Sequence, residues 1–89
     1  MVAPKKVRDV RPVYPEQERR AARDATVKIG AVIGTDGSVR DMRLLSSADA
    51  DFVNAAMDAI SRWQFTATRV AGVPVDTNMI VTVNFEIIR

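Results

Sequence analysis

The chain has 89 residues and a net charge of +2, and this length suits one domain with a single modest core. It contains neither cysteine nor histidine, which excludes disulfides, thiolate metal sites and a serine–histidine relay. No apolar run approaches the roughly 20 residues that a membrane-spanning helix needs. No pair of acidic residues has the spacing of a general acid and base. We therefore expect a binding module that has no enzymatic activity and no cofactor.

The charge is concentrated near the N-terminus. Residues 1–23 carry a balance of +4 and residues 24–89 a balance of −2. This pattern is typical of a solvated basic leader, or of an arm that steers an acidic partner or a membrane surface. Nucleic acid is the weakest alternative, because acidic residues and proline interrupt the basic residues.

The first elements are an extended leader, a short helix and a strand. Residues 1–13 have no helical or strand period and contain two prolines, so we expect an extended leader followed by a domain over 14–89. Pro15 suits the first turn of a helix, which we place at about 15–23. Strict alternation of apolar residues then predicts a strand over 26–33 with one buried face.

The middle of the chain predicts a hairpin and a long helix. Asp36-Gly37 is a turn signal, because glycine adopts a positive φ without strain. A second strand follows over 39–46, and a slip in its apolar phase indicates a bulge near residues 40–41. Ser46, Ser47 and Asp49 are candidate caps for a helix over 49–64, whose apolar stripe ends at Trp63. We expect Trp63 to be a core residue.

The last part predicts a connection over 66–76 and a strand over 77–88. The fold class is then α+β with chain order α-β-β-α-β. The first two strands pair through the hairpin, and the simplest return of the chain places the third strand beside the first. We therefore expect a three-stranded antiparallel or mixed sheet of order 2-1-3, with both helices packed on one face.

The third strand is an edge of this sheet and lacks the usual protection. Residues 77–88 contain no proline, no lysine and one glutamate, whereas natural edges are commonly blunted by such residues or by bulges. Added backbone hydrogen bonds contribute roughly 0.5–1.5 kcal/mol each. The edge therefore fits the capture of an extended peptide by strand addition. The alternatives are that the leader or a second copy of the chain covers the edge, or that nothing does.

Several short motifs occur in an order that resembles a known family. Tyr14-Pro15 precedes a short helix, Asp36-Gly37 follows the first strand, Trp63 lies in an Arg-Trp-Gln-Phe run that closes the long helix, and Gly72-Val73-Pro74-Val75 leads into the last strand. Over about residues 11–88 this order and spacing resemble the C-terminal domain of TonB-type energy transducers.

The resemblance implies a periplasmic domain whose parent protein is anchored in the inner membrane. It implies that the domain binds the TonB box of outer-membrane transporters as an added strand and transmits force for the uptake of siderophores, haem or cobalamin. An ExbB–ExbD-type motor would act through an N-terminal anchor outside this sequence. We expect no nucleic-acid partner. A homodimerisation module, and a sensor or scaffold domain of the same fold without energy coupling, remain open.

The resemblance and the edge argument name the same residues. In the family, a Gln-Pro-x-Tyr-Pro segment touches the partner peptide, and here the matching stretch begins with Arg11. The expected peptide-binding residues lie on this stretch and on the last strand: Arg11, Val13, Tyr14, Thr77, Asn78, Met79, Ile80, Val81, Thr82, Val83 and Asn84.

Overall fold

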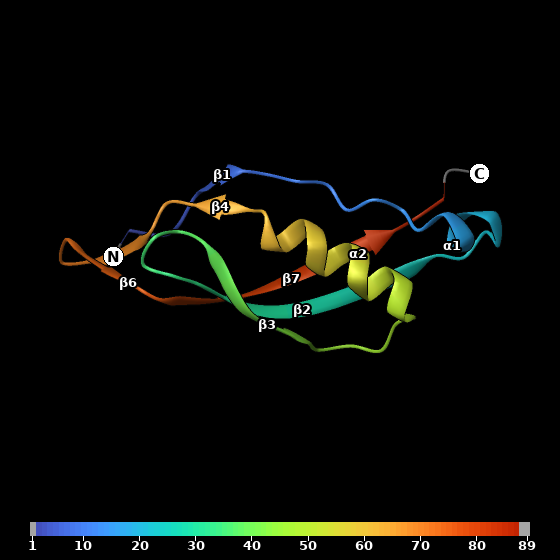
Figure 1. Ribbon diagram of the computed structural model, residues 1–89. Coiled ribbons are helices and arrows are strands. Elements are labelled where there is room, and N and C mark those ends of the chain that lie inside the picture. Colours follow the sequence, from blue (N-terminus) through green and yellow to red (C-terminus); the bar gives the residue numbers. More distant parts are fainter. Residues whose placement is uncertain (1, 88–89) are drawn as a thin grey trace.

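A computed structural model describes residues 2–87 as an elongated domain of about 50 × 21 × 17 Å (Figure 1). Two helices and seven strands follow one another along the chain: β1 (Lys6–Arg8), α1 (Glu16–Arg20), β2 (Ala25–Ile33), β3 (Val39–Leu44), α2 (Ala50–Ser61), β4 (Gln64–Phe65), β5 (Thr68–Val70), β6 (Val73–Val75) and β7 (Thr77–Phe85). No helix in this range is long and apolar enough to cross a membrane.

The main sheet has the expected α+β architecture. Its order is β3-β2-β7 with both pairings antiparallel, so the order 2-1-3 is confirmed. Gly37 adopts the positive φ of 82° that the hairpin requires. The predicted bulge is also present: the β2–β3 register shifts between Gly30 and Val32, and Asp41 opposite this shift has a φ of 53°.

The core lies between one face of this sheet and α2. Period-two alternation in β2 places Val27 and Ile29 on the buried face, where they meet the apolar stripe of α2. Phe52 and Ile60 supply that stripe and are at most 2% exposed. Trp63 is 9% exposed and packs in the same cluster, so its expected place in the core is confirmed.

Helix α1 is shorter than expected because its C-terminus is capped early. The helix ends at Arg20 rather than at residue 23. Ala22 has a φ of 55° and its N–H donates to the Arg19 carbonyl at 3.1 Å, while the Arg23 N–H donates to the Glu18 carbonyl at 3.0 Å. These two bonds form a Schellman motif, in which a left-handed residue stops the helix. Glycine usually occupies that position, so the sequence gives no signal for this end.

Helix α2 is also shorter than the predicted 49–64, because its last residues join a strand pair instead. Asp49 is the N-cap residue and the helix ends at Ser61, so Trp63 and Gln64 lie beyond it. Strand β4 pairs antiparallel with β1 of the leader, opposite Lys6 and Arg8. This pairing supplies backbone hydrogen bonds that a longer helix would have supplied.

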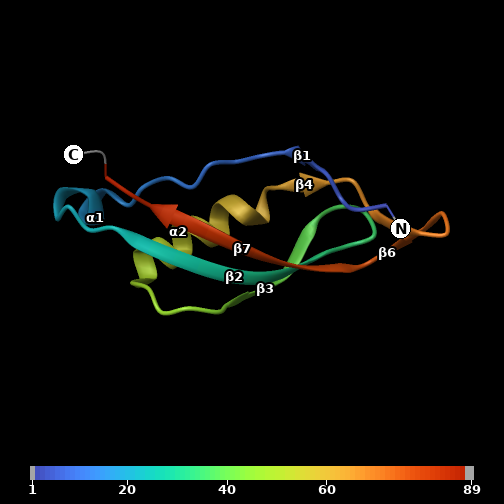
Figure 2. The same cartoon turned by 180° about the vertical axis from the view of Figure 1, so that it is seen from behind.

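The leader is fixed to the domain along much of its length. Besides the β1–β4 pair, the Trp63 indole N–H donates to the Val10 carbonyl at 2.8 Å, and the Lys6 ammonium lies 3.4 Å from the centroid of the Trp63 rings. The Thr66 N–H donates to the Lys5 carbonyl at 2.8 Å. In Figures 1 and 2 the leader follows the β7 side of the sheet, away from β3.

The segment 66–76 is a hairpin, although the sequence predicted a plain connection. Strands β5 and β6 pair antiparallel around Ala71 and Gly72, both of which have positive φ. Pro74 lies within β6, and a proline is compatible with such an edge strand. Strand β7 begins directly after this hairpin and ends at Phe85, whereas we predicted a strand to residue 88, which lies outside the described residues.

Candidate functional site

One edge of β7 has no backbone partner in the described part of the chain. All nine residues of β7 pair with β2 on one side. Within residues 2–87 no backbone hydrogen bond joins its other side to any segment. Alternate N–H and C=O groups along this side therefore remain available to another strand.

The opposite edge of the same sheet is protected. Strand β3 contains the bulge at Asp41, and three of its six residues are charged: Arg40, Asp41 and Arg43. Bulges and charges are the devices by which proteins discourage strand addition. Strand β7 has no charged residue, no proline and no register shift. The sheet thus has one edge that resists pairing and one that is suited to it.

The expected site residues on β7 alternate between two environments. Thr77, Met79, Val81 and Val83 are half-buried on the side of α2, and Asn78, Ile80, Thr82 and Asn84 are exposed on the other face. Ile80 is 71% exposed. A strand added here would have one apolar and one largely polar set of neighbours, because cross-strand pairs form between residues on the same face.

Tyr14 lies at the C-terminal end of β7. Its ring packs edge-on against Phe85, with centroids 5.6 Å apart, and against Phe52 at 5.7 Å. Its hydroxyl donates to the Arg23 carbonyl. Tyr14 therefore fixes the leader to the end of the sheet. Val13 is 78% exposed and Arg11 is exposed, so these two predicted residues lie on the surface beside the packed tyrosine.

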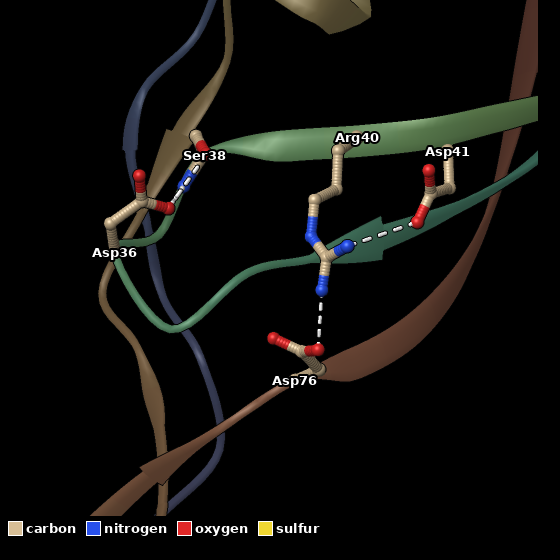
Figure 3. Close-up of polar contacts among 5 residues, drawn as sticks. All are labelled: Asp36, Ser38, Arg40, Asp41 and Asp76. Atoms are coloured by element: carbon tan, nitrogen blue, oxygen red, sulfur yellow. Dashed lines mark hydrogen bonds and ion pairs between the residues drawn. The ribbon is translucent and has the colours of Figure 1, made fainter.

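An ion pair that the sequence did not indicate connects β3 to the N-terminal end of β7. Arg40 of β3 contacts Asp76, the residue before β7, and also lies 3.1 Å from Asp41 (Figure 3). Asp36 in the turn accepts bonds from the N–H and the hydroxyl of Ser38, and these bonds lower the pKa of its carboxyl. Arg40 thus ties the two outer strands together across β2.

The junction of α1 and α2 contains a buried carboxyl. Glu18 is 6% exposed, and its Oε1 lies 3.5 Å from the Arg23 guanidinium, which is equally far from Asp49. Burial raises the pKa of Glu18, the charge of Arg23 opposes this, and the carboxylates of Asp49 and Asp51 add to the rise. Arg23 thus links Glu18 of α1 to Asp49 at the N-terminus of α2.

The chemistry available at this edge is that of backbone hydrogen bonding. Within residues 2–87 no group of three or more Asp or Glu side chains could hold a metal ion. The arrangement combines a rigid sheet, an unpaired edge and an aromatic residue at its end. Such an arrangement is suited to an extended chain and requires no reactive side chains.

Comparisons with known proteins agree with this geometry. Residues 10–87 match the family model for the C-terminal domain of the Gram-negative bacterial TonB protein. The solution NMR structure of the Pseudomonas aeruginosa TonB C-terminal domain superposes with a TM-score of 0.83 at 27% identity, over 97% of this chain and 88% of that one. A search of curated proteins gives no match. The chain belongs to the TonB C-terminal family, whose members are non-enzymatic transducer domains of the Gram-negative periplasm that interact with outer-membrane transporters.

Proposed function

We propose that this domain binds the TonB box of outer-membrane transporters as an additional strand on the free edge of β7. The observation that supports this most strongly is the contrast between the two sheet edges, since β3 carries a bulge and charges and β7 carries neither. Family membership supports a transporter as the source of the peptide. Residues Thr77–Asn84 would supply the edge, with Tyr14, Val13 and Arg11 at its end.

The parent protein would be anchored in the inner membrane and driven by an ExbB–ExbD-type motor. Force would reach the domain through the leader, and the peptide would pass it to the transporter. The cargo would be a siderophore, haem or cobalamin. The β1–β4 pairing and the bond from Trp63 to Val10 support this role, because they connect the N-terminal segment to the core at several points.

An amide NMR titration with a TonB-box peptide tests the proposal. Two isomeric peptides are compared. One is N-methylated at the odd-numbered residues of the peptide and the other at the even-numbered residues. In an added strand, only one phase of N–H groups faces β7. We expect shifts along residues 77–84 with one isomer and none with the other. Equal binding by both isomers would rule out strand addition and indicate capture by side chains.

Measuring the mass of the free domain separates the remaining alternatives. A concentration-dependent dimer that excludes the peptide would show that a second copy pairs with β7. A monomer with no shifts at millimolar peptide would favour a sensor or scaffold domain without energy coupling.

A further inference from the structure

Two cations of the sheet, Lys28 of β2 and Arg43 of β3, form no ion pair in the described part of the chain. The outer face of the sheet is the face turned away from α2, and no helix lies in front of β2 and β7 there (Figure 2). Lys28 and Arg43 point to this face, because their neighbours Val27 and Ile29 in β2 are buried and Arg43 is registered with Gly30. Neither forms an ion pair with any residue between 2 and 87.

The position of the Arg43 guanidinium depends on Gly30. A Cβ atom at Gly30 would lie 3.3 Å from Arg43 Nε and 3.4 Å from its Cζ. The guanidinium therefore lies over the backbone of β2, reaching from β3 toward β7. On β7, the residue opposite Gly30 is Ile80. The β7 residue in register with this position is thus an exposed apolar side chain and not an acid.

A strand added to β7 places its outward side chains within reach of this charge. Neighbouring strands lie about 4.8 Å apart, so the new strand runs about 10 Å from β2, the strand that carries Lys28 and over which the Arg43 guanidinium lies. Long side chains of the domain and of the added strand extend toward each other and shorten the distance between their charges. The remaining gap lies within the Debye length of about 8 Å at physiological ionic strength. The outward positions opposite Ile80 and Thr82 lie beside Arg43 and Lys28, since Lys28 is registered with Thr82.

We infer that Arg43 and Lys28 select partner peptides that carry carboxylates at outward positions of the added strand. The inference rests on the proposed strand addition to β7. A glutamate suits the position opposite Ile80 particularly well, because its methylene groups cover the isoleucine while its carboxylate faces the guanidinium. Strand β7 itself contributes no charge, so this selectivity comes from β2 and β3.

The probes are two blocked peptides of alternating sequence, Thr-Val-Glu-Val-Glu-Val-Thr and the same peptide with lysine in place of glutamate. Valines on the half-buried side place the charged residues outward. Exposed ion pairs contribute little individually, so for two pairs we expect about three- to tenfold tighter binding of the glutamate peptide. The preference should disappear in 1 M salt.

Charge reversal locates the effect. The K28E/R43E variant should reverse the preference, and the K28Q/R43Q variant should abolish it. The R20E/R62E variant has the same net charge as K28E/R43E but changes residues of α1 and of the end of α2, and it should retain the preference for glutamate.

Each other result overturns the inference. Equal affinities for the two peptides in the unmodified domain, with shifts on β7, would leave strand addition standing and refute the role of the two cations. The same reversal in R20E/R62E would assign the preference to net charge. An absence of β7 shifts with both peptides and with the TonB-box peptide would refute strand addition itself.

Discussion

Two glycines with the same backbone conformation provide a sharp test of the packing between the β2–β3 turn and β4. Gly37 has a φ of 82° and Gly72 a φ of 81°. A Cβ at Gly37 would lie 1.8 Å from the Phe65 carbonyl oxygen, whereas a Cβ at Gly72 would have no atom within 4 Å. Alanine at either position incurs the left-handed penalty of roughly 1–2 kcal/mol. The difference between the two variants therefore isolates the contact.

The magnitude follows from what Gly37→Ala displaces. Phe65 must move, and its N–H, which donates to the Gly37 carbonyl at 2.9 Å, loses a bond worth roughly 0.5–1.5 kcal/mol. Overpacking adds roughly 1–3 kcal/mol. We expect Gly37→Ala to lower the free energy of unfolding by about 2–4 kcal/mol more than Gly72→Ala does. For a domain of this size that is a large part of the total stability.

Urea denaturation followed by far-UV circular dichroism measures both variants. The fluorescence of Trp63, the single tryptophan, reports on the same region. Equal destabilisation by the two substitutions would refute the reasoning, because it would mean that β4 does not press against the turn.

Two further predictions concern the core and the α1–α2 junction. Trp63→Ala should lower the free energy of unfolding by about 3–5 kcal/mol and increase amide exchange in the leader near Val10. Trp63→Phe should have smaller effects on both quantities. Unchanged urea midpoints would contradict the packing of Trp63 in the core. Burial raises the pKa of Glu18 above its usual 4.5 in the folded state. The protonated Glu18 therefore contributes to stability below pH 4.5, and this contribution is lost as the pH rises through the folded pKa. Glu18→Gln should therefore gain stability relative to the unmodified domain between pH 4 and pH 7 in urea titrations, and parallel pH profiles would contradict the assignment.

Local patterns in the sequence determined the main sheet and its core. The alternation in residues 26–33 and 77–85 specified two strands and the face that each buries, because the side-chain period of a strand is two. The stripe ending at Trp63 specified α2, and Gly37 specified the hairpin. The unprotected edge of β7 was also evident, because charges and proline are absent from its sequence.

Contacts between distant segments decided the rest, and no local pattern encodes them. Gln64 and Phe65 leave the helix because the leader, more than 50 residues earlier, offers them a strand partner. The neighbour relations of the strands also decide that Arg40 pairs with Asp76 and that the Arg43 side chain lies over Gly30. A sequence states the preferences of each segment, whereas long-range pairing and burial decide which of those preferences are satisfied together. For that reason the charges beside the candidate site became visible only in the tertiary structure.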